Sequence, residues 1–141
     1  MLRRTLYYLA LLVVTSSAFA IEFTDDTLTV VKKNVTQKKA VLVDVRSQHE
    51  WDKGHVEGAI FLPITKLEQI EPVKLSKLLP KKKIIYTYCA VGLRAEAAGE
   101  ILAQEGYAVR VLQPGYEKLV KAGFKKTVEK APGKASDENP R

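Results

Sequence analysis

Residues 84–102 read IIYTYCAVGLRAEAAGEIL and contain Cys89, the only cysteine of the 141-residue chain. The β-branched and aromatic run at residues 84–88 is short and follows three lysines, which favours a strand over a helix. Ala98 and Ile101 then recur at the spacing of one helical face. The stretch therefore predicts a buried strand, a short loop that opens on the cysteine, and an amphipathic helix.

The position of Cys89, at a strand end just before a helix, suits a reactive thiol. The first turn of a helix leaves backbone N–H groups unpaired, and these point with the positive end of the helix dipole into the preceding loop. Thiolate is the nucleophilic form of cysteine, and a helix N-terminus together with a cation such as Arg94 favours that form. Gly92 can adopt a positive φ, which lets successive N–H groups converge on an anion. The loop therefore predicts a nucleophilic cysteine in an anion-binding nest.

Strand and helix patterns alternate along the rest of the chain. Residues 40–45 form a nearly continuous apolar run, typical of a strand in a parallel sheet that is covered on both faces. Further strands are expected at residues 59–62 and 107–112. A helix is expected over residues 28–35, capped by Asp25 or Asp26, and a helical turn at residues 47–53. Residues 64–79 should form two short helices broken at Pro72, and a last helix is expected at residues 117–121. This alternation predicts an α/β fold with a parallel sheet. Ligands of such sheets bind beyond the carboxyl ends of the strands, where the Cys89 loop falls.

Three motifs, in this order, resemble the single-domain rhodaneses, a family of sulfurtransferases. They are DVR at residues 44–46, EWDKGHVEGAIFLP at residues 50–63 and CAVGLR at residues 89–94. The similarity runs from about residue 24 to about residue 124. It implies an α/β, rhodanese-like fold with a central parallel five-stranded sheet flanked by helices on both faces.

The resemblance implies a sulfurtransferase that moves a sulfane sulfur from thiosulfate or a persulfide donor to a thiophilic acceptor, cyanide or a thiol. Cys89 is the implied sulfur acceptor and cycles between thiolate and persulfide, so no separate cofactor is expected. The implied binding loop for the outer sulfur is formed by the backbone amides of Ala90, Val91, Gly92, Leu93 and Arg94. Small sulfur-containing anions such as thiosulfate, and a protein that donates or accepts sulfur, are the partners that the resemblance implies.

The same resemblance assigns Asp44 and Arg46 to the wall around the loop, through hydrogen bonds or an ion pair rather than through catalysis. Glu50 is a candidate partner for Arg46. His55 belongs to a Gly-His motif in which the histidine is mostly structural, and Trp51 is expected to pack in the core or at the rim of the pocket. The two histidines and one cysteine lack the spacing of metal ligands, so no metal is expected.

Two alternative functions share parts of this pattern. Cysteine phosphatases and arsenate reductases also form an anion loop between a cysteine and an arginine, but with five intervening residues, whereas four separate Cys89 from Arg94. The chain also lacks an evident general-acid aspartate directly after the loop. A non-enzymatic persulfide carrier, or a binding module of the rhodanese fold, remains the second alternative, since a fold alone does not decide function.

The first twenty residues predict a secretory signal peptide. Arg3 and Arg4 precede an apolar run at residues 6–14 that is too short to span a bilayer. The small-x-small pattern at residues 18–20 predicts cleavage after Ala20. We therefore expect an exported, periplasmic protein with no stable membrane insertion after cleavage, and an uncleaved membrane anchor is the alternative.

Length and charge narrow the remaining choices. A chain of 141 residues with 46% apolar residues suits one core, so we expect a monomeric domain at residues 21–124 and a polar, disordered tail at residues 125–141. The formal net charge of +7 would help to attract small anions. No aromatic-basic motif indicates nucleic-acid binding. A lone cysteine in an exported protein cannot form an internal disulfide, so Cys89 is an inert buried residue, an intermolecular partner or a reactive thiol. The glycine-containing loop, Arg94 and the helix start favour the reactive thiol over the buried residue.

Overall fold

A central parallel sheet organises the computed structural model, which describes residues 21–128; the expected signal peptide at residues 1–20 lies outside them. The sheet has four strands in the order β3-β1-β4-β5. Their bounds are β1 (Ala40–Asp44), β3 (Ile60–Phe61), β4 (Ile84–Tyr88) and β5 (Ala108–Val111). Every neighbouring pair is parallel, so the predicted α/β fold with a central parallel sheet is confirmed.

The described part of the chain differs from the expected five-stranded sheet at one edge. Beyond β5, Phe23 forms a single parallel bridge with Val111, and the Thr24 N–H donates one hydrogen bond of 2.8 Å to the Val111 carbonyl oxygen. Three residues later Thr27 caps the next helix, and its side chain accepts a hydrogen bond from the Val30 N–H. The expected cap at Asp25 or Asp26 is therefore wrong, and the fifth strand is reduced to one bridge.

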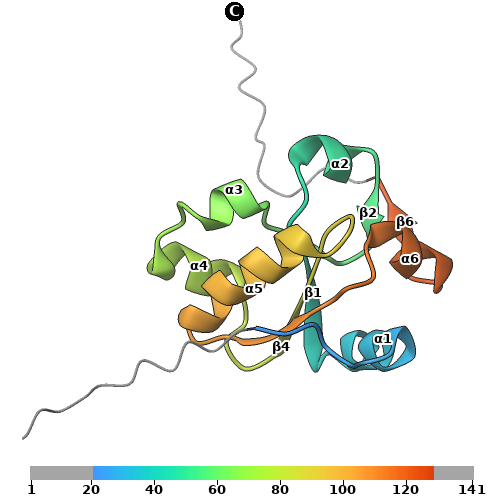
Figure 1. Cartoon of the computed structure of the whole chain (residues 1–141), viewed down its shortest axis with the longest axis horizontal. Coiled ribbons are helices and arrows are strands. Elements are labelled where there is room, and N and C mark those ends of the chain that lie inside the picture. The colour runs from blue at the N-terminus through green and yellow to red at the C-terminus, as the bar shows by residue number, and fades with distance from the viewer. Residues whose placement is uncertain (1–20, 129–141) are drawn as a thin grey trace, which may run out of the picture.

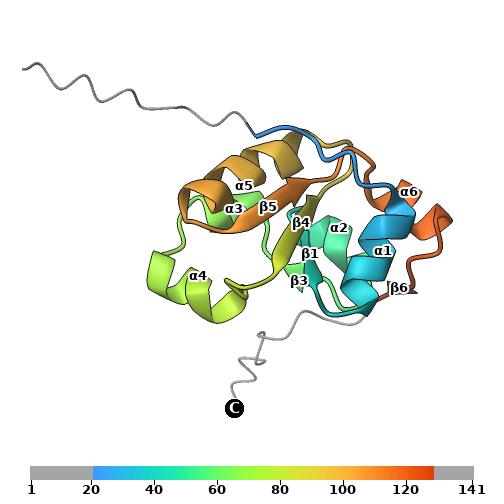
Figure 2. The ribbon, with the colours of Figure 1, turned by 90° about the horizontal axis from the view of Figure 1, so that it is seen from below.

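Helices cover both faces of the sheet, as predicted (Figures 1 and 2). The bounds of the helices are α1 (Leu28–Thr36), α2 (Gln48–Asp52), α3 (Ile64–Leu67), α4 (Pro72–Leu78), α5 (Leu93–Gln104) and α6 (Tyr116–Lys121). One core contains buried residues of α3, α4 and α5, and the other contains residues of α1 and α6. Successive strand residues point to opposite faces, so Ile85 belongs to the first core and Tyr86 to the second.

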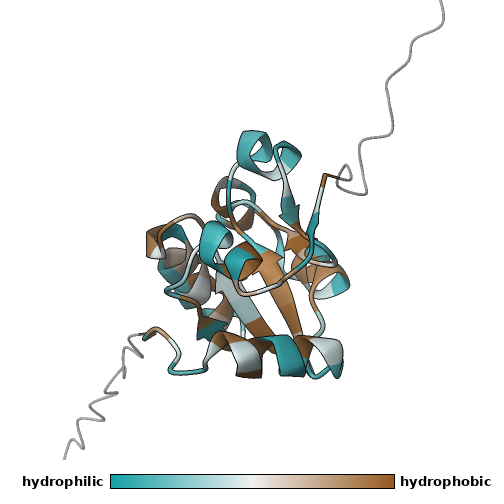
Figure 3. Ribbon diagram, turned by 90° about the vertical axis from the view of Figure 1, so that its right-hand side faces the viewer, coloured by the Kyte–Doolittle hydropathy of each residue, from teal (hydrophilic) through white to brown (hydrophobic). Residues whose placement is uncertain are grey.

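Figure 3 shows hydrophobic segments among the central strands, while the helices show a mixture of both colours. In β1 every residue except the second is buried, and in β4 every residue except the first is buried. This agrees with the prediction of a strand covered on both faces. Pro72 is the first residue of α4, so it begins the second of the two short helices between β3 and β4.

A small antiparallel ribbon lies apart from the main sheet. It pairs β2 (His55–Val56) with β6 (Lys126–Thr127). Because β6 falls within the segment expected to be a tail, the ordered fold extends beyond residue 124, while residues 129–141 lie outside the described range. Within residues 21–128, none of the helices has the length and apolar character needed to cross a membrane.

Candidate active site

The carboxyl ends of β1 and β4 lie side by side, with Asp44 opposite Tyr88 in the parallel register. The Val45 N–H extends this pairing with a 3.1 Å hydrogen bond to the Tyr88 carbonyl oxygen. The turn after β1 and the Cys89 loop after β4 therefore meet at one edge of the sheet, as the sequence predicts. In Figure 1 the loop that leads into α5 lies close to α2.

Cys89 directly follows β4, and it has no exposed surface. The Gly92 N–H donates a hydrogen bond to Cys89 Sγ, with an N···S distance of 3.1 Å. Gly92 caps α5 with φ of 101°, a conformation that glycine adopts readily because it has no Cβ. The sulfur therefore lies at the N-terminus of α5, where unpaired N–H groups and the helix dipole stabilise negative charge.

A second turn supports the Cys89 loop through backbone contacts. The Tyr116 N–H donates a hydrogen bond of 2.9 Å to the Cys89 carbonyl oxygen. Gly115 approaches the loop so closely that a Cβ at this position would lie 1.7 Å from the Ala90 carbonyl oxygen. Sequence reasoning missed this contact, and its signal was a glycine between Pro114 and the last helix.

Arg94, the second residue of α5, forms a two-point ion pair with Glu50 of α2. The Nη1···Oε2 distance is 2.6 Å and the Nη2···Oε1 distance is 2.8 Å. The hydrogen bonds from Arg94 lower the pKa of Glu50 to about 2. Those with Glu50 raise the pKa of Arg94 above its ordinary value, and interaction with Cys89 adds to this increase. Glu50 therefore pairs with Arg94, and the expectation that Glu50 pairs with Arg46 is wrong.

The N-terminus of α2 holds Glu50 in position. Ser47 caps the helix by accepting a hydrogen bond from the Glu50 N–H, and its own N–H and hydroxyl both donate to Glu50 Oε2, at 3.0 and 2.8 Å. This reciprocal capping box restrains the carboxylate that Arg94 contacts. The short helix α2 thus connects the turn after β1 to the start of α5.

Asp44 and Arg46 form a buried ion pair, one of the two kinds of contact that the family resemblance implies for the wall of the site. Arg46 Nε and Nη2 lie 3.0 and 2.6 Å from Asp44 Oδ2, and Nη2 also donates to the Gly54 carbonyl oxygen at 2.9 Å. The Tyr88 hydroxyl donates to the same Asp44 oxygen at 2.8 Å. Burial lowers the pKa of Arg46, but the hydrogen bonds and charge of Asp44 outweigh it and raise that pKa overall. Burial is also the main reason that the pKa of Tyr88 is raised.

His55 and Trp51 pack in the core beside this wall. Their rings stack with centroids 3.4 Å apart and an interplanar angle of 7°. His55 Nδ1 lies 3.1 Å from the Trp51 carbonyl oxygen, and both side chains are buried. These contacts support the structural roles expected for both residues. Across residues 21–128, no group of three histidine, cysteine or acidic side chains is arranged to hold a metal ion.

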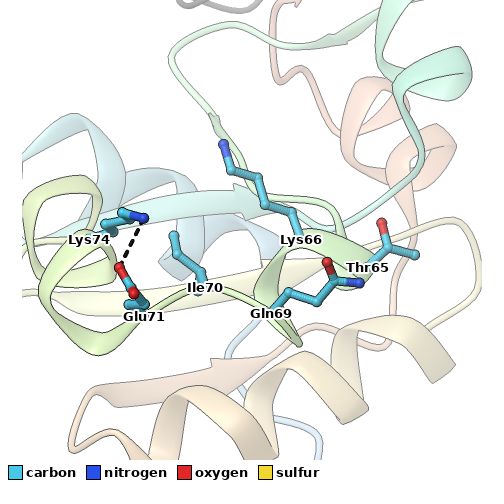
Figure 4. Close-up of a pocket in the computed structure, with 6 residues that line it drawn as sticks. All are labelled: Thr65, Lys66, Gln69, Ile70, Glu71 and Lys74. Carbon is cyan, nitrogen blue, oxygen red and sulfur yellow. Dashed lines mark ion pairs between the residues drawn. The ribbon is translucent and has the colours of Figure 1, made fainter.

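A separate hollow with a volume of about 440 Å³ lies at α3, the start of α4 and the segment between them (Figure 4). Its lining consists of Thr65, Lys66, Gln69, Ile70, Glu71 and Lys74. Lys74 and Glu71 form an exposed ion pair of 2.9 Å there. None of the lining residues belongs to the Cys89 loop, and none is a strong nucleophile, so we assign the chemistry to the loop.

Comparisons with known proteins support the family that the sequence resembles. A family model described as "Rhodanese-like domain" matches residues 27–122. A rhodanese-related protein from Thermoplasma volcanium is 26% identical with a TM-score of 0.61, over 72% of this chain and 95% of that one. The human single-domain sulfurtransferase TSTD1 is 25% identical with a TM-score of 0.56, over 64% of this chain and 89% of that one.

The curated relatives are longer proteins. The tRNA uridine(34) hydroxylase of Staphylococcus aureus is 34% identical over 77 residues, which cover 54% of this chain and 24% of the relative. The chain thus spans about a quarter of the length of the curated relatives that it matches.

Proposed function

The chain belongs to the family of rhodanese-like domains, and we propose on this basis that it is a sulfurtransferase that acts through a persulfide on Cys89. Likeness to the human single-domain sulfurtransferase supports the general class. The observation that carries the proposal is the 3.1 Å hydrogen bond from the Gly92 N–H to the sulfur at the N-terminus of α5. This arrangement stabilises an anionic sulfur, and both a thiolate and a persulfide can carry that charge.

In the proposed reaction, sulfur moves by double displacement. The Cys89 thiolate attacks the outer sulfur of thiosulfate or of a persulfide. A new S–S bond forms on Cys89, and the old bond breaks, its electron pair leaving with sulfite or with the donor's thiolate. Cyanide or a thiol then attacks the outer sulfur of the Cys89 persulfide, and Cys89 departs as a thiolate. The electron pairs balance within the two steps, so the proposed cycle uses no further cofactor.

The surrounding residues support this chemistry by position and charge. In the proposal, the backbone N–H groups of residues 90–94 surround the outer sulfur. Arg94 donates one hydrogen bond from each Nη atom to Glu50, and in the proposal its positive charge stabilises the anionic sulfur. Asp44 and Arg46 hold the neighbouring wall, and their mutual hydrogen bonds give them a structural role.

We further propose that the protein acts as a monomer in the periplasm. This rests on the signal-peptide pattern of residues 1–20 and on the size of the chain. Cell fractionation followed by N-terminal sequencing tests it, with Ile21 as the expected first residue of the mature protein. An unprocessed chain in the membrane fraction would support the anchor instead.

Intact-mass measurement of the reduced, folded protein tests the sulfurtransferase cycle. Samples are treated with thiosulfate or with cysteine persulfide and then with cyanide. We expect a gain of one sulfur atom, released to cyanide as thiocyanate. Cys89→Ser is the matched control and should gain no sulfur, because it removes the only cysteine. A folded protein that gains no sulfur from either donor would contradict the proposal and favour a binding module. A Cys89 persulfide that forms once but is not turned over, so that thiocyanate production stops at one sulfur per protein, would favour a carrier.

A further inference from the structure

Five lysines gather where two strands of the main sheet begin. Residues 38–39 directly precede β1, and residues 81–83 directly precede β4. These strands are neighbours with Ala40 opposite Ile84, and the Ile84 N–H donates a hydrogen bond of 3.1 Å to the Lys39 carbonyl oxygen. The two lysine segments therefore lie side by side. We call these residues the lysine edge: Lys38, Lys39, Lys81, Lys82 and Lys83.

Ion pairs do not neutralise the positive charge of the lysine edge. Among residues 21–128, none of the five lysines takes part in an ion pair. Four of them are exposed and Lys83 is half-buried. Residues 27–43 and 72–95 contain no acidic residue. Lys81 donates a hydrogen bond to the Glu105 carbonyl oxygen, so one acidic residue lies beside the edge, and five lysines with this acid leave a net charge of +4.

Lys38 has an unusual backbone conformation for a lysine. Its φ is 57°, and no other residue except glycine has a positive φ within residues 21–128. It follows Gln37, the C-cap of α1, at a position that glycine usually occupies because it lacks a Cβ. The chain thus has a lysine where the backbone favours glycine, and an uncommon conformation of this kind indicates a function of the side chain.

The lysine edge lies at the opposite end of the sheet from Cys89. Strands β1 and β4 each have five residues, and a strand rises about 3.3 Å per residue, so about 16 Å separates the two ends. In Figure 1, α1 and the turn before β4 lie below the sheet, while α2, beside the Cys89 loop, lies above it. Exposed charges interact over about 8 Å at physiological ionic strength. The lysine edge is therefore too far away to attract a substrate to Cys89, and its charge indicates a separate interaction.

The composition of the lysine edge distinguishes between classes of acidic partner. It has no arginine, and the ring that the Lys81 ammonium approaches, 3.8 Å from the centroid, belongs to buried Tyr107. Protein interfaces depend on tryptophan, tyrosine and arginine and are depleted in lysine. Single-stranded nucleic acids are bound by exposed aromatic rings and arginine. Lysines are hydrated point charges on flexible chains, and they suit a diffuse negative surface.

We infer that the lysine edge binds the surface of an anionic lipid bilayer. The ammonium groups contact the phosphate headgroups and do not enter the hydrocarbon. Each lysine near such a surface strengthens binding about fivefold. The Cys89 loop then faces away from the bilayer, because it lies at the other end of the same strands. The inference goes beyond the proposed sulfurtransferase function and does not depend on it.

Co-sedimentation with lipid vesicles tests the inference. The protein, processed after Ala20, is mixed with vesicles of phosphatidylcholine that either contain or lack phosphatidylglycerol. We expect binding only to the vesicles with phosphatidylglycerol, and weaker binding as the salt concentration rises. A triple variant that combines Lys39→Gln, Lys82→Gln and Lys83→Gln should bind about a hundredfold more weakly, because three fivefold contributions are lost. Lys38→Gly should weaken binding about fivefold without lowering the melting temperature.

The matched control combines Lys53→Gln, Lys66→Gln and Lys118→Gln. These lysines are exposed, and they lie after α2, in α3 and in α6, which follow the carboxyl ends of the strands. The control removes the same charge and should keep binding within about threefold of the wild type. Circular dichroism checks that each variant is folded.

Equal weakening in the two triple variants would overturn the inference, because net charge alone would then explain binding. Equal binding to both kinds of vesicle, or to neither, would also overturn it. Binding to poly-glutamate without binding to vesicles would favour an acidic protein partner instead. The vesicle assay involves no sulfur transfer, so none of these results bears on the proposed function.

Discussion

Glu50→Gln removes one charge from the ion pair with Arg94 and should destabilise the protein in a pH-dependent way. In the folded protein the pKa of Glu50 falls from 4.5 to about 2, chiefly because of the hydrogen bonds from Arg94. A shift of this size corresponds to about 3 kcal/mol if it is counted in full. The two side chains are 36% and 31% exposed, so solvent screening reduces the expected loss to about 1–2 kcal/mol.

The direction of the pH dependence follows from the lowered pKa. The carboxylate stabilises the fold above its unfolded pKa of 4.5, and this contribution is lost as the pH falls through the folded value of about 2. Urea denaturation gives the unfolding free energies of the wild type and of Glu50→Gln, and their difference is measured at several pH values from about 7 to about 3. We expect a constant difference down to about pH 4.5 and a smaller one below it.

A double-mutant cycle separates the ion pair from the capping box, since Glu50 also contacts Ser47. Combining Glu50→Gln with Arg94→Gln should give a coupling energy of about 1–2 kcal/mol near neutral pH. A coupling energy near zero, or a destabilisation that is the same at every pH, would refute the reasoning. Glu50 would then stabilise the protein only through the N-terminus of α2.

Two further predictions concern the support of the loop and its wall. Gly115→Ala should slow persulfide formation by about a hundredfold, because a Cβ would lie 1.7 Å from the Ala90 carbonyl oxygen and displace the loop. Val73→Ala, at an exposed position of α4, is the control, and equal intact-mass rates in both variants would contradict this prediction. Tyr88→Phe should lower the free energy of unfolding by about 1–3 kcal/mol in urea denaturation, since buried Asp44 loses a 2.8 Å hydrogen bond. An unchanged stability would show that Arg46 alone satisfies that carboxylate.

The parts of the site that depend on neighbouring residues were predictable from the sequence. The run at residues 84–88 is β4, Gly92 has the positive φ that the loop needs, and the helix follows directly. Asp44 and Arg46 are two residues apart, so their pairing needs only a turn at a strand end. In each case the information lies within a few positions, where local backbone preferences decide the conformation.

The partner of Glu50 was not predictable in this way. Arg46 is four residues before Glu50, a spacing that suggests a pair on one helix. In the structure Ser47 is the N-cap of α2, so Arg46 lies before the helix and turns inward to Asp44. The actual partner, Arg94, is 44 positions away, and the contact depends on how α2 lies against the start of α5. Helix packing of this kind leaves no local sequence signal.

The short strand pairings at the periphery of the fold were also not predictable from local sequence patterns. Phe23 pairs with Val111 through a single bridge, and β6 is a strand of two residues within the polar segment after residue 124. Such short pairings contribute few hydrogen bonds, so neither hydrophobic alternation nor turn residues mark them. The Gly115 contact is similar, because it joins backbone to backbone and involves no side-chain motif.

The backbone and the side chains of the Cys89 loop have separate roles, and this separation determines which substitutions in the loop preserve the anion-binding nest. The sulfur receives its hydrogen bond from the Gly92 backbone, and the loop is supported by the backbone of Gly115 and Tyr116. These contacts do not depend on the side chains of Val91 and Leu93, which point largely into solvent. Substitutions at Val91 or Leu93 should therefore leave the shape of the nest unchanged, whereas substitutions at Gly92 or Gly115 should impair sulfur transfer from every donor.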